Sequence, residues 1–127
     1  MKTKINLSDG EWKLMAKLWE TSPRTITQLT AALREETGWE KHTVITMLSR
    51  LEAKGAVTHD GATPKGYTPL ISRRAAQRRE TESFLDKVYS GRLGAMMSAM
   101  VDAHALTAQD VAELSAILER AKEEEGK

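Results

Sequence analysis

The residues with the clearest chemical pattern lie in segment 40–54, whose apolar side chains recur at the spacing of one helix face. That face consists of Val44, Met47, Leu48 and Leu51. The other side and its flanks are short, mostly polar and free of acidic groups; they consist of His42, Thr43, Ile45, Thr46, Ser49, Arg50 and Ala53. Hydroxyls donate or accept hydrogen bonds, and an isoleucine can contact a thymine methyl. We therefore expect this face to read base edges, with Lys41 and Arg50 on phosphate. A plain solvated helix face is the alternative.

Other reactive side chains lack the spacing of a catalytic or metal site. His42, His59 and His104 lie in three separate segments, and the chain has no cysteine. Single histidines rarely supply the ligands that a metal needs. The methionines at 96, 97 and 100 are expected in a core or a subunit interface, where methionine usually fills gaps. No Ser/His/Asp arrangement, carboxylate pair or glycine-rich phosphate loop stands out, so we expect no enzymatic activity, no metal and no cofactor.

Three helices and a β-ribbon are expected to position the reading face. Capping-box patterns begin helices at Ser8 and Thr25, the first running over 8–21 and the second ending near Gly38. The apolar face expected for the first helix consists of Trp12, Met15, Ala16 and Trp19. Strands at 56–59 and 66–70, joined by the turn pair Asp60-Gly61, form a wing. Lys65 and Tyr67 on the wing are placed to reach phosphate or the minor groove, although a core position for Tyr67 is equally compatible.

Residues 72–127 are expected to form helices at 72–90, 93–103 and from 107 onward. Their apolar side chains exceed what so small a module can bury, which favours burial against a second subunit. The predicted dimer interface consists of Phe84, Leu85, Val88, Met96, Met97, Met100, Val111, Leu114, Ile117 and Leu118. A cluster of Arg73, Arg74, Arg78 and Arg79 opens the first of these helices, and a solvated face explains it better than a DNA contact does. The sequence thus predicts a mainly α fold with a small β-wing: a winged helix-turn-helix over 1–71 and a helical dimerisation domain over 72–127.

Composition limits the function classes only weakly. The 127 residues carry a net charge of +1, so bulk charge does not indicate nucleic-acid binding. The N-terminus lacks the apolar run of a secretory signal, and no segment is long and apolar enough to cross a membrane. These features predict a cytoplasmic protein without membrane insertion.

The ordered motifs resemble the penicillinase-repressor family (BlaI/MecI/CopY type). The resemblance runs through Leu7-Ser8-Asp9-Gly10-Glu11-Trp12, Gly38-Trp39-Glu40-Lys41-His42-Thr43-Val44, Leu48-Ser49-Arg50-Leu51, Tyr67-Thr68-Pro69-Leu70 and Ser83-Phe84-Leu85-Asp86-Lys87-Val88-Tyr89. It implies homodimeric transcriptional repressors that bind palindromic, double-stranded operator DNA. In the antibiotic-resistance members it also implies a membrane metalloprotease sensor, and cleavage within the dimerisation domain that releases the repressor.

The chain departs from this family at informative positions. The family's scissile bond aligns with Ala99–Met100, where the family has Asn-Phe. Ser-Pro is frequent in the family at the positions of Glu40 and Lys41, and a basic residue at Ile45. The copper-responsive members use paired cysteines, which are absent here. The operator and the inducing signal are therefore not predicted, and a winged-helix adaptor that binds protein instead of DNA is the rival hypothesis.

Overall fold

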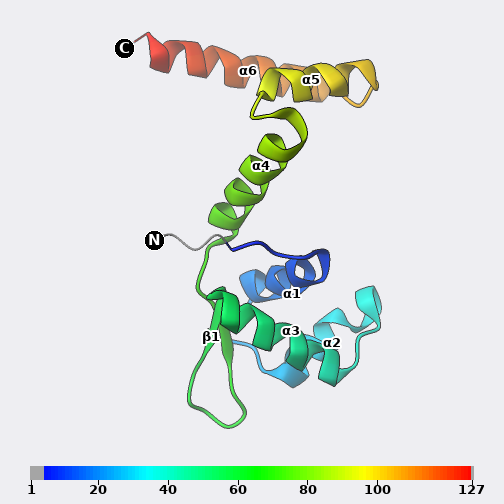
Figure 1. Cartoon of the computed structure of the whole chain (residues 1–127), viewed down its shortest axis with the longest axis vertical. Helices are drawn as coiled ribbons and strands as arrows, with labels where there is room; N and C mark the ends of the chain where they lie inside the picture. Colours follow the sequence, from blue (N-terminus) through cyan, green and yellow to red (C-terminus); the bar gives the residue numbers. More distant parts are fainter. Residues whose placement is uncertain (1–4, 127) are drawn as a thin grey trace. The chain divides into compact units, whose positions relative to one another are not determined.

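The computed structural model describes residues 5–126, which are mainly helical with one small sheet. They form two compact units, the first ending at Glu80 and the second beginning at Thr81. The first unit contains α1 (Asp9–Glu20), α2 (Ile26–Thr37), α3 (Lys41–Lys54), β1 (Val57–His59) and β2 (Tyr67–Pro69). α4 (Arg73–Tyr89) begins in the first unit and ends in the second, which also contains α5 (Leu93–Asp102) and α6 (Ala108–Glu125) (Figure 1). The predicted fold class is confirmed, while the predicted division between residues 71 and 72 stays a prediction.

Local capping fixes where the helices of the first unit begin and end. Ser8 accepts a hydrogen bond from the Glu11 backbone N–H at 3.2 Å, and the Glu11 carboxylate accepts one from the Ser8 N–H at 2.8 Å. Thr25 and Gln28 form the same reciprocal pair at the start of α2. α2 ends at Thr37 and is followed by Gly38, whose φ of 68° is the left-handed conformation that glycine adopts without a steric penalty. The three-residue link to α3 follows directly.

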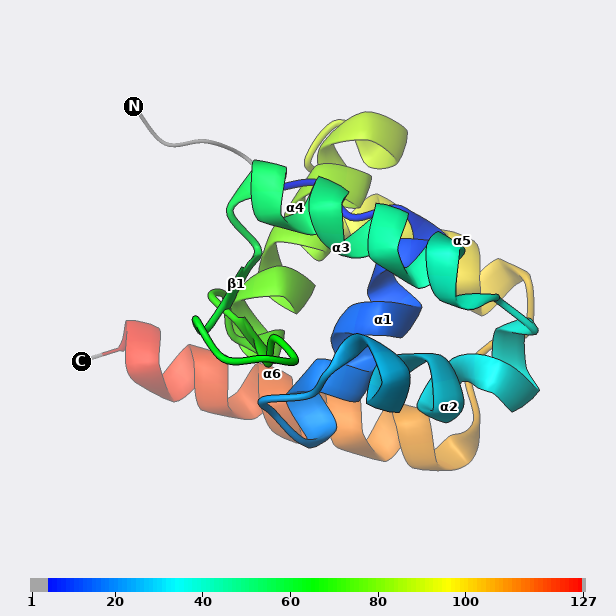
Figure 2. The ribbon, with the colours of Figure 1, turned by 90° about the horizontal axis from the view of Figure 1, so that it is seen from below.

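The core of the first unit lies between α1, α2 and α3 (Figure 2). Its largest fully buried side chains are Leu14, Met15, Leu18, Leu29, Leu33, Leu48, Leu51 and Val44. On α1 this differs from the predicted face, because Leu14 and Leu18 are buried with Met15 while Trp12 and Trp19 are only half-buried. The two indole rings instead meet edge to face with centroids 5.6 Å apart, at the border of the core.

The wing is a two-stranded antiparallel ribbon in which Val57 pairs with Pro69 and His59 pairs with Tyr67. The Asp60 side chain holds its turn by accepting hydrogen bonds from the backbone N–H groups of Ala62 and Gly66. The connection between α1 and α2 joins this ribbon, since Arg24 and Tyr67 exchange backbone hydrogen bonds of 3.1 and 2.8 Å. The sequence did not predict this third strand-like segment.

The second unit has regular helices but no buried side chain among its described residues, 81–126. α6 begins with a capping box in which Thr107 accepts a hydrogen bond from the Asp110 N–H at 3.0 Å. The Phe84 and Tyr89 rings meet with centroids 6.2 Å apart. No described helix of the chain has the length and apolar character needed to span a membrane.

Candidate nucleic-acid interface

α3 presents one buried and one open face. Val44, Leu48 and Leu51 are fully buried. The open face consists of Lys41, His42, Ile45, Thr46, Ser49 and Arg50, all exposed, with Thr43 half-buried beside them. The Thr46 hydroxyl donates a hydrogen bond to the His42 carbonyl at 3.0 Å, which leaves its oxygen free to accept another. α3 therefore offers a continuous, mostly polar surface that carries no acidic side chain.

A recess of about 350 Å³ lies between α3 and the wing. It brings together five of the nine predicted DNA contacts: Lys41, Ile45, Ser49, Lys65 and Tyr67. The other four, His42, Thr43, Thr46 and Arg50, do not line it. Its charged lining residues are Lys41, Lys65 and Glu52, and the Glu52 carboxylate lies against His59, so the two lysines are the charged groups available to a phosphate.

Tyr67 belongs to the core, because the residue is only 6 % exposed. Its backbone pairs with Arg24, and its ring lies against the His59 ring with centroids 5.6 Å apart. Of the two positions that the sequence left open for Tyr67, the core position is therefore the one that its ring occupies. Burial, with a smaller effect from the Glu52 charge, raises the pKa of the Tyr67 hydroxyl, so it remains a protonated donor at neutral pH.

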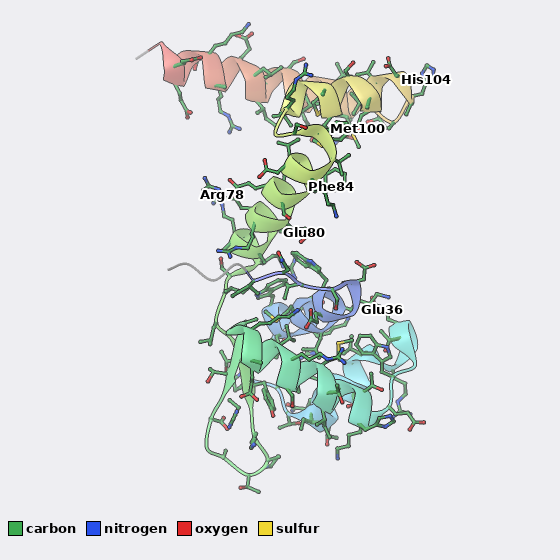
Figure 3. The ribbon with its side chains drawn as sticks, in the orientation of Figure 1. Glu36, Arg78, Glu80, Phe84, Met100 and His104 are labelled. Carbon is green, nitrogen blue, oxygen red and sulfur yellow. The ribbon has the colours of Figure 1, made fainter. Side chains whose placement is uncertain are left out.

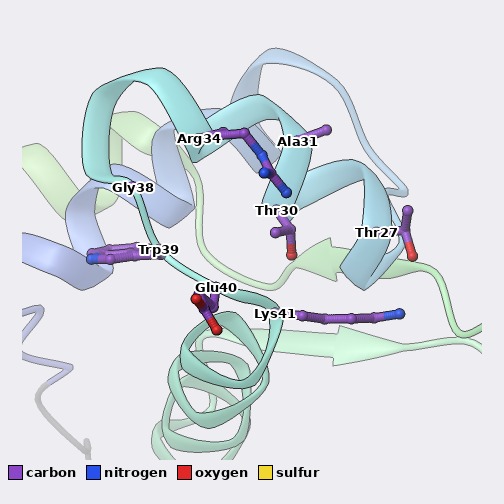
Figure 4. Close-up of a pocket in the computed structure, with 8 residues that line it drawn as sticks. All are labelled: Thr27, Thr30, Ala31, Arg34, Gly38, Trp39, Glu40 and Lys41. Carbon is purple, nitrogen blue, oxygen red and sulfur yellow. The ribbon is translucent and has the colours of Figure 1, made fainter.

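A second recess, of about 500 Å³, lies at the turn between α2 and α3 (Figure 4). Thr27, Thr30 and Arg34 line it from α2, Trp39 and Glu40 line it from the link, and Lys41 lines it from the first residue of α3. The two cations, Arg34 and Lys41, lie on different helices. Arg34 was not singled out from the sequence. The sequence feature that could have identified it is its position one turn before Gly38, where the chain bends towards α3.

Two polar side-chain contacts fix α3 against its neighbours. The His59 Nδ1 atom of β1 lies 2.5 Å from a Glu52 carboxylate oxygen of α3, which joins the helix to the wing. At the end of α3, the Lys54 ammonium donates to Glu11 Oε1 at 2.5 Å and to the Asn6 carbonyl at 2.7 Å. Burial alone would raise the pKa of Glu11, but Lys54 and the Ser8 hydrogen bonds together bring it below its ordinary value. α3 is thus anchored to the wing through Glu52 and to the start of α1 through Lys54.

The start of α4 is anchored to α1. Ser72 accepts a hydrogen bond from the Ala75 N–H at 3.0 Å, as an N-cap does. The Trp19 indole N–H donates to the Ile71 carbonyl at 2.9 Å, and the Arg73 guanidinium lies over the same indole, 5.6 Å from its centroid. One residue of the arginine cluster therefore has a contact within the first unit that explains its place.

The predicted interface residues of the second unit are open to solvent. Six are exposed: Phe84, Val88, Met100, Val111, Ile117 and Leu118. Four are half-buried: Leu85, Met96, Met97 and Leu114. Leu93 and Val101 are also exposed and were not predicted. Figure 3 labels Phe84 on α4 and Met100 on α5. Ala99 and Met100, the aligned cleavage position, both lie within α5. Among the described residues no cluster of potential metal ligands exists.

Comparison with known proteins gives one family. The penicillinase repressor family matches residues 7–120. A penicillinase repressor of Bacillus licheniformis is 31 % identical over 126 residues, which covers 96 % of both chains. The methicillin resistance regulatory protein MecI of Staphylococcus aureus (strain N315) is 22 % identical over 116 residues, covering 90 % of this chain and 94 % of MecI. The solution structure of the DNA binding domain of the repressor BlaI matches with a TM-score of 0.51 at 32 % identity, covering 57 % of this chain and 90 % of that domain.

Proposed function

The chain belongs to the penicillinase repressor family, and on that premise we propose that it is a cytoplasmic transcriptional repressor that binds palindromic operator DNA as a homodimer. The observation that carries the proposal is the open face of α3: six exposed, non-acidic side chains on a helix whose other face is fully buried. In a helix-turn-helix the second helix enters the major groove with its N-terminal residues on base edges. Membership of this family implies no enzymatic activity.

The contacts divide by chemistry. Thr46 and Ser49 offer hydroxyls to base edges, and Ile45 offers an apolar surface to a thymine methyl. His42 and Thr43 belong to the first turn of α3, where base contacts concentrate. Cations contact phosphate: Lys41, Arg50 and Lys65 from the predicted set, with Arg34 added by the recess between α2 and α3.

Gel-shift titrations on specific and mixed-sequence duplexes test this division. Arg50→Ala should weaken binding to all sequences and reduce the salt dependence by about one phosphate contact. Thr46→Ala should change the preference among sequences with little change in salt dependence. Lys13→Ala, on the exposed side of α1, is the matched control and should change neither. A chain that fails to bind any duplex at low salt would support the protein-binding adaptor instead.

Homodimerisation rests on the apolar side chains of the second unit. Eight large hydrophobic residues between 84 and 118 are exposed in a unit with no buried side chain among those described. Solvent does not favour such a surface, and a second copy presents the same residues for mutual burial. Two linked half-site contacts then bind far more tightly than one, without further contacts to the bases.

Release of DNA follows from the same arrangement, because any change that separates the subunits removes the linkage between half-sites. We include in the proposal a signal acting on the second unit, either cleavage at Ala99–Met100 or another modification. Since both residues lie within α5, a protease needs this helix to unfold locally before it can cut. A membrane metalloprotease sensor, or a protease downstream of it, is the partner that this version requires.

A further inference from the structure

Glu40 is the N-cap residue of α3, but its side chain does not cap the helix, and the same holds for Arg92 before α5. Ser8, Thr25 and Thr107 each accept a hydrogen bond from the backbone N–H three residues on, but the Glu40 side chain makes no such bond at the start of α3. Glutamate is also a poor N-cap residue compared with serine, threonine, aspartate or asparagine. A capping hydrogen bond therefore does not explain the carboxylate at this position.

The Glu40 carboxylate instead lies beside an imidazole. One of its oxygens is 3.9 Å from His42 Nδ1, and the two side chains are 80 % and 79 % exposed. Figure 4 shows Glu40 and Lys41 leaving the start of α3 in different directions, so the cation next to it in sequence does not cover it. The first turn of α3 thus presents a hydrogen-bond acceptor and a hydrogen-bond donor side by side, since an imidazole carries at least one N–H in either protonation state.

We propose that Glu40 and His42 together select one G·C base pair in each operator half-site. Glu40 accepts a hydrogen bond from the cytosine N4 amino group, and His42 donates one to O6 or N7 of the guanine. This inference rests on the proposed function, because it needs α3 in the major groove. It adds Glu40, which lies outside the open face described above, to the residues that read the sequence, and it gives His42 a specific base contact.

The major-groove pattern of the bases explains why this base pair is selected. A G·C pair presents two acceptors on the guanine and then one donor at the cytosine end. An A·T pair presents its donor between two acceptors, N7 of adenine and O4 of thymine. A carboxylate over that central donor faces an acceptor on each side, which repels it. On a G·C pair, by contrast, the carboxylate meets the cytosine donor at one end of the three groups, and the imidazole can lie above the two guanine acceptors.

A carboxylate near DNA is unfavourable with any other base pair. It weakens binding through repulsion from phosphates and leaves its oxygens without donors, so it disfavours wrong sites as well as favouring the right one. The net effect on affinity for DNA in general is therefore negative, while the effect on discrimination is positive. Simple charge repulsion would change only the affinity for DNA in general, so a change in discrimination between sequences tests the inference separately.

The experiment is selection of binding sites from a randomised duplex library by the full chain, followed by affinity measurements on single-base variants of the selected site. Glu40→Gln is the main variant, because glutamine pairs with adenine through N6 and N7. The wild type should select cytosine at one position per half-site. Glu40→Gln should admit adenine there and lower the cytosine-over-adenine ratio about tenfold. His42→Ala should weaken selection of the same base pair without admitting adenine.

Glu36→Gln is the matched control, because it removes one exposed acidic charge from the last turn of α2 and should leave the selected sequence unchanged. Circular dichroism of Glu40→Gln should match that of the wild type, since the replaced side chain makes no capping bond. An unchanged selected sequence with tighter binding everywhere would show that Glu40 only repels phosphate, and the inference would be wrong. Failure of the wild type to enrich any sequence would overturn the proposed function, and this inference with it.

Discussion

Replacing Leu118 by alanine should weaken the proposed homodimer without affecting the winged helix. Leu118 lies on α6 with 61 % of its surface exposed, the largest exposed fraction among the large hydrophobic residues described. Full burial of a leucine side chain is worth about 1.5–3 kcal/mol. Dimerisation can bury only the part of Leu118 that is exposed in the single chain, and an alanine would still bury a fraction of that part. The difference between leucine and alanine corresponds to about 1 kcal/mol per subunit.

A two-fold dimer contains the residue twice, so the change amounts to about 2 kcal/mol, or about a thirtyfold increase in the dimer dissociation constant. Sedimentation equilibrium over a dilution series measures this constant directly. Leu70→Ala is the matched control, because Leu70 is 58 % exposed but lies directly after β2 in the first unit. The reasoning is refuted if Leu118→Ala leaves the dissociation constant unchanged, or if Leu70→Ala raises it equally.

Three further predictions concern the contacts that anchor the first unit. Lys54→Met should lower the free energy of unfolding at pH 7 by about 2 kcal/mol, because it leaves the Glu11 carboxylate, whose side chain is 3 % exposed, without its partner. The loss is smaller than for a fully buried pair, since the Lys54 side chain is 37 % exposed. Urea denaturation measures the loss, and adding Glu11→Gln should restore part of it. The pKa of Glu11 is lowered by folding, so its stabilising effect is present above the ordinary glutamate pKa and is lost as the pH falls through the folded-state value. The stability difference between wild type and Glu11→Gln should therefore shrink between about pH 5 and pH 3, and a constant difference would contradict this. Trp19→Phe should cost about 1 kcal/mol by removing the hydrogen bond to the Ile71 carbonyl, and an unchanged urea midpoint would show that water replaces it.

Helix ends in this chain were predictable because their determinants are local. The reciprocal pairs at Ser8–Glu11 and Thr25–Gln28 join residues three positions apart, and Gly38 and Gly55 have the left-handed conformations expected of them. The buried face of α3 was predictable for a related reason: Val44, Leu48 and Leu51 recur at helical spacing, and Ile45 is the one large apolar residue on the open face.

Features that depend on distant residues were not predictable. α1 has apolar side chains on more than one face, so periodicity alone did not separate buried Leu14 and Leu18 from the half-buried tryptophans. The pairing of Arg24 with Tyr67 uses backbone atoms, which leave no side-chain pattern. Arg34 entered the candidate interface only when folding placed it beside the start of α3.

The second unit marks a different limit. Its helices have clear boundaries, but its apolar residues have no buried counterpart among those described, and in the proposed homodimer their burial depends on a partner, the second copy. Neither periodicity nor exposure decides which of them meet that partner. The sequence likewise does not predict whether a protease can cut at the aligned cleavage position. Ala99 and Met100 lie in a regular helix, and its resistance to a protease depends on what packs against it.

The separation of α3 into a buried and an open face also bears on how such proteins diversify. Exposed positions away from special contacts typically change the free energy of unfolding by less than about 0.5 kcal/mol when substituted. The open face of α3 consists almost wholly of such positions, while Val44, Leu48, Leu51 and the Lys54–Glu11 pair hold the helix in place. New side chains at the open face can therefore accumulate without endangering the fold. After gene duplication, a few substitutions at these positions could direct one copy to a different operator. A library randomised at these positions should yield well-folded repressors that bind different operator sequences and do not bind each other's.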